Sequence, residues 1–253
     1  MNKKSIVIIL TAFWLTACAS QQVELTSNSS SSITVSKVSS LQAFNRDAYL
    51  FNKSIDKGVI KLLAKGYRQV TPEFVNTGIT NVFSNLGDVP NAINALLQFK
   101  IKDAASDTGR FVVNSTIGLG GVFDIATKME LQKHHEDFGQ TLAKWGVPSG
   151  EYIMLPVLGP STARDSVGVV VDTVTNPYFF FKNSLAYYTV DKIDKRADLL
   201  SVDGLLNDMS DDDYNSLRDA WLQKRKYLIN DGKLDKKAIE KKKSLIDELE
   251  DLD

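Results

Sequence analysis

The chain has 253 residues, with 30 lysines and arginines against 31 aspartates and glutamates. A net charge of −1 gives no overall attraction to nucleic acid, so that class of partner is not expected. The single cysteine has no disulfide partner within the chain. With 43% hydrophobic residues, the composition is that of one ordinary globular domain with appendages.

The first residues have the layout of a secretory signal. Lys3 and Lys4 precede an apolar run from Ile6 to Leu15. This run is about half of the roughly 20 residues that a membrane-spanning helix needs. A signal peptide over residues 1–17 is therefore expected, rather than a membrane span.

The cysteine that follows this segment predicts a lipid anchor. Cys18 comes directly after a Leu-x-Ala triplet, which resembles the lipobox of bacterial lipoproteins. We therefore expect acyl chains on Cys18 to hold the protein at a membrane surface. Ala19 stands where an aspartate would resemble an inner-membrane retention signal, which favours the periplasmic side of the outer membrane. Residues 18–40 are serine-rich and are expected to form a flexible tether.

From Leu41 on, apolar residues recur at three- and four-residue steps, which predicts amphipathic helices. The expected helices cover residues 41–66, 71–87, 88–99, 102–116, 161–176, 191–200 and 211–230. The alternation of side chains that is typical of a β-strand occurs only from Tyr152 to Leu158, a stretch too short to form a sheet by itself. The expected architecture is a mainly α domain over residues 41–232 with a short hairpin-like loop. A charged, solvent-exposed tail over residues 233–253 completes the chain.

No constellation in the sequence predicts an enzyme, a catalytic residue, a metal or a cofactor. Gly118-Leu119-Gly120-Gly121 lacks the spacing of a phosphate-binding loop and predicts a tight turn. His134 and His135 are adjacent, so on a helix they would diverge by about 100° and could not share a metal. A surface turn is expected there. Arg164 and Asp165 are expected to form a structural ion pair.

Several segments, taken in order, resemble the VacJ/MlaA family of outer-membrane lipoproteins. The matching stretches are Phe44-Asn45-Arg46, Phe51-Asn52, residues 81–86, 94–98, 110–124, 137–142 and 152–156, Gly159-Pro160-Ser161, Arg164-Asp165, residues 196–200 and residues 203–206. Phe99 departs from the family pattern, which has glycine after Leu-Leu-Gln.

The resemblance implies a ring-shaped assembly of amphipathic helices in the inner leaflet of the outer membrane. It implies a complex with a trimeric outer-membrane porin and a central channel that removes phospholipids from the outer leaflet. A soluble periplasmic carrier would receive them. The phospholipid is then a transported ligand, and the only covalent group is the lipid on Cys18. The candidate residues for the channel and its control are Phe44, Asn45, Arg46, Phe51 and Asn52, with Gly146, Val147 and Pro148 in a mobile loop nearby.

Two other functions stay open at this stage. The protein could be a structural lipoprotein that binds porins without moving lipid. The hypothesis that the protein is an envelope hydrolase is supported only by His134 and His135. The sequence has no nucleophile motif such as Gly-x-Ser-x-Gly.

Overall fold

The computed structural model describes residues 30–203 and 213–233. The signal peptide, Cys18 and nearly all of the charged tail lie outside the described residues. The chain divides into two compact units, residues 1–40 and 41–253, and the contacts below lie within the second.

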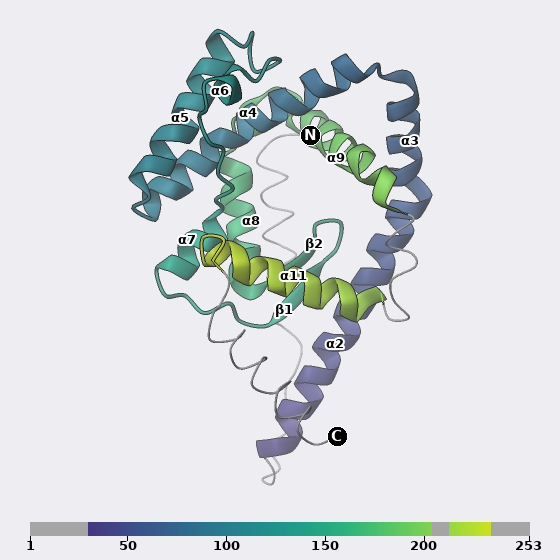
Figure 1. Ribbon diagram of the computed structural model, residues 1–253. Coiled ribbons are helices and arrows are strands. Elements are labelled where there is room, and N and C mark those ends of the chain that lie inside the picture. Colours follow the sequence, from purple (N-terminus) through teal and green to yellow (C-terminus); the bar gives the residue numbers. More distant parts are fainter. Residues whose placement is uncertain (1–29, 204–212, 234–253) are drawn as a thin grey trace, which may run out of the picture. The chain divides into compact units, whose positions relative to one another are not determined.

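The structure is mainly helical, which confirms the predicted fold class (Figure 1). The α-helices are α2 (Ser30–Ile55), α3 (Lys61–Val70), α4 (Glu73–Leu97), α5 (Ile101–Thr116), α6 (Ile125–Lys128), α7 (Phe138–Lys144), α8 (Ala163–Thr175), α9 (Ser184–Asp198) and α11 (Asp213–Ile229). Short turns of other helix types are η1 (Asp56–Ile60), η2 (Pro177–Phe180) and η3 (Leu199–Val202). The antiparallel strands β1 (Tyr152–Leu155) and β2 (Gly159–Thr162) form a two-stranded hairpin. The stretch from Tyr152, expected to be too short to form a sheet, therefore does pair with a second strand.

Two of the helices are longer than predicted at their N-terminal ends. α2 begins at Ser30, within the segment expected to be a flexible tether. Extending an existing helix by one residue is far easier than nucleating a new one, and serine lowers helix stability only slightly. α9 begins at Ser184 rather than at Asp191.

The predicted break in the middle of α4 is wrong. One helix runs from Glu73 to Leu97 through both Gly87 and Pro90, where two helices were expected. The same holds for Gly66, which lies inside α3 rather than after it. Glycine and proline weaken a helix locally, but contacts with neighbouring elements override this preference. α4 has such contacts along its length, because it packs against α5, α7, α8 and α9.

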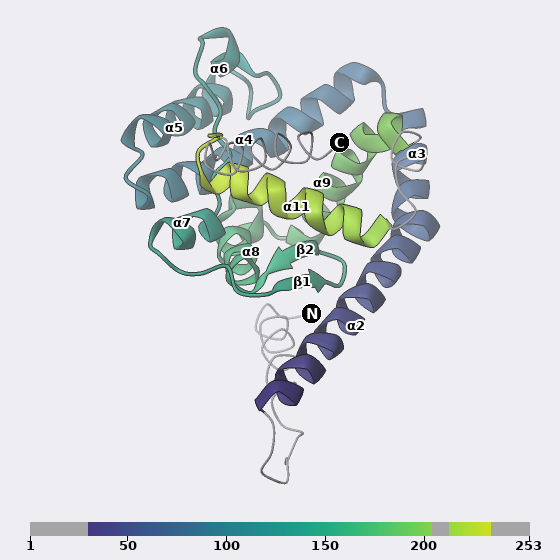
Figure 2. The same ribbon diagram turned by 60° about the horizontal axis from the view of Figure 1, so that its bottom comes forward.

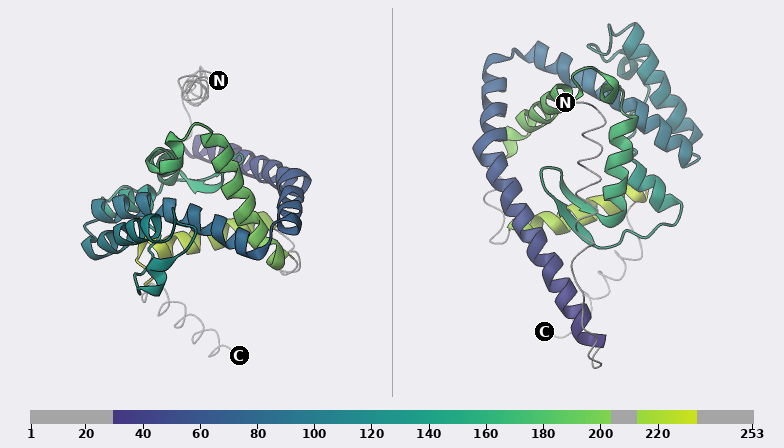
Figure 3. Two further views of the ribbon diagram at one scale, coloured as in Figure 1. Left: turned by 90° about the horizontal axis from the view of Figure 1, so that it is seen from above. Right: turned by 180° about the vertical axis from the view of Figure 1, so that it is seen from behind.

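Within residues 41–253, contacts between the elements close a circuit. α4 lies beside α5, as Figures 1 and 3 show, and also contacts α7 and α8. α8 packs on β2, which pairs with β1. Hydrogen bonds then join β1 to α2, and α2 continues through η1 into α3 and back to α4.

α11 packs against the hairpin and against α7 (Figure 2). The ring of Tyr152 on β1 lies 6.4 Å from that of Tyr214 and 6.0 Å from that of Trp221, centroid to centroid. Tyr214 is buried in a small apolar cluster with Ala48 and Met154. This cluster fixes the hairpin between α2 and α11.

The segment that contains both histidines lies partly at the surface, where His135 is exposed, but it is not the predicted turn. It runs without helix or strand between α6 and α7, and its backbone is held by polar side chains. His134 donates its backbone N–H to Asp107 at 3.0 Å, and its carbonyl accepts from Asn91 at 2.6 Å. The His135 carbonyl accepts from Gln140 at 2.8 Å. The glycine cluster does form a turn, where Gly121 has a φ of 93°.

Candidate functional site: a polar cavity within an apolar exterior

The described part of the chain reverses the usual placement of polar and apolar side chains. Among the described residues, eight apolar residues are buried, and six of these are alanines. Nineteen polar or charged residues are buried. In a water-soluble protein, large apolar side chains fill the interior and charged ones are seldom buried. The interior of this chain is instead a network of hydrogen bonds.

α4 contributes the longest part of this network. A stripe of polar side chains follows it at helical spacing, and each pairs with a different neighbouring segment. Asn76 donates to Asp194 at 2.8 Å, Asn85 to Ser115 at 2.9 Å, Asn94 to Asp172 at 2.9 Å, and Gln98 to Glu136 at 2.8 Å. Asp88, fully buried on the same helix, forms an ion pair with Lys133. Because buried polar groups are costly unless paired, this stripe fixes α4 against its neighbours.

Large parts of the exterior are apolar. Large apolar side chains are exposed on several of the described helices; examples are Leu62 on α3 (67% exposed), Val170 on α8 (60%) and Leu185 on α9 (73%). In hydrocarbon, a protein turns apolar side chains outward and satisfies its polar groups internally. No helix within residues 30–203 and 213–233 has both the length and the hydrophobicity needed to cross a bilayer.

A cavity of about 560 Å³ lies within this polar interior. α4, α8, α9, the segment before α7 and the hairpin contribute to its wall. The charged residues that line it are Lys133, Glu136, Asp137, Asp172, Asp191, Lys192, Asp194 and Lys195. Apolar side chains, among them Phe83, Leu155 and Val169, line it as well. The cavity is therefore amphipathic.

Most carboxylates in the cavity wall are held by hydrogen bonds. Asp194 accepts from Tyr67, Asn76 and Thr80, each at 2.8 Å. Asp172 accepts the backbone N–H of Phe138 at 3.0 Å. Burial nevertheless raises the pKa of Asp172 to about 6. These carboxylates are fixed parts of the wall.

Lys192, also in the cavity wall, contacts an aromatic ring. Its ammonium group lies 5.2 Å from the centre of the Tyr188 ring, a cation–π contact. Burial lowers the pKa of Lys192, and the positive charge of Lys195 lowers it further. An ammonium group beside an aromatic ring can pair with an anionic group that enters the cavity.

The predicted control residues of α2 hold the hairpin rather than the cavity. The Asn45 side chain donates to the Tyr152 carbonyl at 2.9 Å and accepts the Met154 N–H at 2.8 Å. Two helical turns later, Asn52 donates to the Leu155 carbonyl at 2.9 Å and accepts the Val157 N–H at 2.7 Å. The two amides thus occupy hydrogen-bonding groups along the free edge of β1.

The remaining predicted residues of α2 lie elsewhere on the same helix. Phe44 and Phe51 are about half exposed. The Arg46 guanidinium lies 5.0 Å from the centre of the Tyr214 ring, on α11. None of the five predicted residues of α2 is among those that line the polar cavity.

The predicted loop of Gly146, Val147 and Pro148 follows α7 and does not line the polar cavity. Gly146 adopts a left-handed conformation, with a φ of 88°. The Val147 carbonyl accepts from the Arg164 side chain at 3.4 Å. Arg164 also donates to Asp165, predicted as its ion-pair partner, at 2.9 Å. The structure therefore brings Arg164, Asp165 and this loop together.

The residues of the cavity itself were missed by reasoning from the sequence. A signal for part of the cavity exists in α4, where polar residues recur at positions 76, 80, 84, 88, 91 and 94. Of these, Thr80, Ser84 and Asn91 line the cavity. A second signal is the set of charges at Asp191, Asp194 and Lys195 on α9. Asp191 and Asp194 are buried, whereas Lys195 is exposed.

The fold and the site define a class of protein: a helical body with an amphipathic cavity, a hydrogen-bonded polar interior and an apolar exterior. A model of the MlaA lipoprotein family matches residues 39–228. The chain belongs to this family.

Known relatives support the assignment over most of the chain. The chain is 33% identical to an intermembrane phospholipid transport system lipoprotein MlaA of Haemophilus influenzae, over 98% of this chain and 97% of that protein. It is 31% identical to the protein of the same description from Escherichia coli K12, over 84% of this chain and 87% of the relative.

A solved structure has the same fold. It is described as "Structural basis for maintenance of bacterial outer membrane lipid asymmetry". The match has a TM-score of 0.67 and 33% sequence identity, and covers 75% of this chain and 98% of the other.

Proposed function

We propose that this protein is a phospholipid-transport lipoprotein of the outer membrane. It removes phospholipids that have reached the outer leaflet and passes them to a soluble periplasmic carrier. The lipid asymmetry of the outer membrane is then maintained. No catalytic step is part of this proposal.

One observation carries the proposal: an amphipathic cavity with both cationic and anionic side chains lies in a body that exposes many large apolar side chains. A phospholipid moving through a membrane protein needs a polar path for its headgroup, because a charged group in hydrocarbon is costly. Lys192 offers a partner for the headgroup phosphate. The apolar exterior allows the same body to lie in a lipid leaflet.

Other parts of the proposal rest on the family resemblance and on the descriptions of the relatives. Acyl chains on Cys18 anchor the protein at the periplasmic side of the outer membrane. A trimeric porin holds the helical body in place. In this proposal, the lipid anchor localises the protein to the outer membrane, and the helical body transports the phospholipid.

Deletion of the protein tests the proposal. We expect phospholipid to appear in the outer leaflet of the deletion strain, detected by an outer-leaflet acyltransferase or a membrane-impermeant amine label. Wild-type protein and the Lys182→Glu variant restore asymmetry, because Lys182 is not among the residues that line the cavity. The Lys192→Glu variant, with the same charge change inside the cavity, does not. Unchanged outer-leaflet phospholipid in a clean deletion strain contradicts the proposal.

A further inference from the structure

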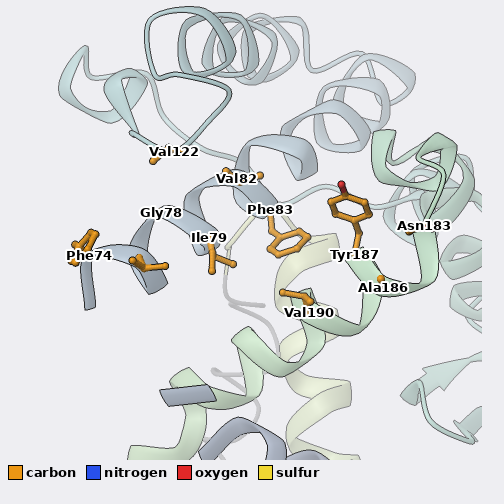
Figure 4. A pocket seen from close by; sticks show the side chains of 11 residues that line it. Phe74, Gly78, Ile79, Val82, Phe83, Val122, Asn183, Ala186, Tyr187 and Val190 are labelled. Atoms are coloured by element: carbon orange, nitrogen blue, oxygen red, sulfur yellow. The ribbon is translucent and has the colours of Figure 1, made fainter. Parts of the chain in front are cut away.

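A second cavity, of about 640 Å³, lies on the other side of the same pair of helices. Its lining residues come from α4, α9 and the turn before α6, and most of them are shown in Figure 4. They are almost all apolar; Asn183 and Tyr187 are the only ones with polar side-chain atoms. The volume lies within the roughly 300–1,000 Å³ of typical small-molecule sites.

The two cavities share a wall. Phe83 of α4 lines both of them. Along α4, Ile79 lines the apolar cavity and the next residue, Thr80, lines the polar one. Along α9, Val190 and Asp191 are divided in the same way. Each helix therefore presents an apolar face to one cavity and a polar face to the other.

The apolar cavity is not filled by the chain's own described side chains. Phe74 at one end is 78% exposed, and Val190 in the wall of α9 is 39% exposed. Large contiguous patches of exposed apolar surface usually mark a site that binds a partner, a ligand or a membrane. In Figure 4, the Phe83 ring points from α4 toward Val190 and Tyr187 on α9.

We propose that the apolar cavity binds one acyl chain of the phospholipid whose headgroup lies in the polar cavity. The Phe83 ring then lies beside the boundary between headgroup and chain. This inference rests on the proposed function, since it assigns the second half of the same ligand. This occupant matches both linings, because a phospholipid has one charged end and one apolar end and the two cavities meet at Phe83. A partner helix or peptide in the apolar cavity would leave the polar one without a ligand.

Photo-crosslinking in vesicles tests the assignment. The full-length protein is reconstituted with phosphatidylethanolamine that carries a diazirine either at the end of one acyl chain or on the headgroup. We expect the acyl probe to label residues 74–83 and 183–190, and the headgroup probe to label the segment from Tyr188 to Lys195. Peptide mapping by mass spectrometry locates each adduct.

A matched pair of variants separates occupancy of the cavity from general lipid contact. Ala186 lines the cavity and is exposed, so Ala186→Phe adds volume there without displacing a buried side chain. We expect acyl labelling of the cavity to fall about tenfold. Leu185→Phe, at an exposed neighbouring position outside the cavity, leaves labelling unchanged. Thermal unfolding of both variants is expected to match that of the wild type.

The outcomes distinguish this inference from the proposed function. If the headgroup probe labels the polar cavity while the acyl probe labels only the outer surface around Val112 and Val170, the acyl-chain site is wrong and the transport proposal stands. If neither probe labels either cavity, both fail. Acyl labelling that appears only after Cys18→Ser would mean that the protein's own anchor occupies the cavity, which overturns the inference.

Discussion

Arg225 joins α11 to the rest of the domain, and its removal should be strongly destabilising. Its guanidinium donates to Asp165 through Nε at 2.8 Å and Nη2 at 2.9 Å. It also donates to Asp137 through Nη1 at 2.5 Å and Nη2 at 2.7 Å. One side chain on α11 thus pairs with carboxylates at the starts of both α7 and α8.

The structure gives the magnitude of the effect of Arg225→Met. Breaking a buried ion pair by removing one partner costs about 3–5 kcal/mol. Asp165 keeps Arg164 at 2.9 Å, and Asp137 keeps the Gln140 N–H at 2.8 Å, so the lower end applies. A loss of about 3 kcal/mol lowers the Tm by roughly 6–12 °C for a chain of this size.

Arg218→Met is the matched control, because Arg218 lies on the same helix and pairs with Asp219 at 2.9 Å near the surface. We expect a loss of about 0.5 kcal/mol or less for this exposed pair. Thermal unfolding followed by circular dichroism in mild detergent measures both variants. If Arg225→Met unfolds within error of Arg218→Met, the reasoning about the buried network is refuted.

The pH dependence gives an independent check on the same network. Burial alone would raise the pKa of Asp137, but the hydrogen bonds and the charge of Arg225, together with the hydrogen bonds from Gln140, hold that pKa below its usual value of 3.8. The ionised carboxylate therefore stabilises the fold above that pH, and its contribution is lost as the pH falls below it. The wild type and Arg225→Met should converge in stability in strong acid.

Substitutions at three further positions test other parts of the structure. Asp172 has a pKa of about 6 in the folded state against 3.8 in the unfolded state, so ionisation of this carboxyl destabilises the fold by on the order of 3 kcal/mol as the pH rises from 4 to 6. Asp172→Asn should therefore flatten the dependence of the unfolding free energy on pH over this range, measured by urea titration. An unchanged slope would count against the assignment. Phe99 is 84% exposed and has a φ of 62°, a backbone conformation that glycine adopts without strain. Phe99→Gly should therefore raise the free energy of unfolding by roughly 0.5–1 kcal/mol. A loss of stability would show that the ring of Phe99 is needed. Asn52→Leu should speed hydrogen exchange at the Val157 amide, while Asn52→Asp, which keeps the acceptor, should not; equal exchange in both would argue against the contact.

Local sequence signals predicted the helical class but not all of the elements. α6 and α7 have four and seven residues, too few to show a helical period. Their starts are marked by Asp124 and Asp137, whose side chains accept the N–H of Thr127 and of Gln140. Gly87 predicted the end of one helix and Pro90 the start of another, because local propensity cannot register the neighbours that keep α4 intact.

The site was less predictable than the fold for a physical reason. Periodicity shows that a helix has a polar and an apolar face, but not which face meets the rest of the protein. In water, the apolar face is buried; in α4, the stripe with Asn85 and Asp88 is buried, and Ile93 and Leu96 are exposed. Asn45 and Asn52 came from the family resemblance, and the structure assigns them to the edge of β1. The cavity around Lys192 required the tertiary structure.

The central claim is that the apolar part of the exterior, which includes Val170, contacts lipid while the cavity is open to water. Because Cys18 is the only cysteine in the sequence and is expected to be acylated, single introduced cysteines can report this in isolated outer membranes. A membrane-impermeant maleimide should modify Lys192→Cys in the cavity and Gln223→Cys on exposed α11 before any solubilisation. Val170→Cys should react only after detergent is added. Equal reaction of Val170→Cys and Gln223→Cys in intact membranes would contradict the account.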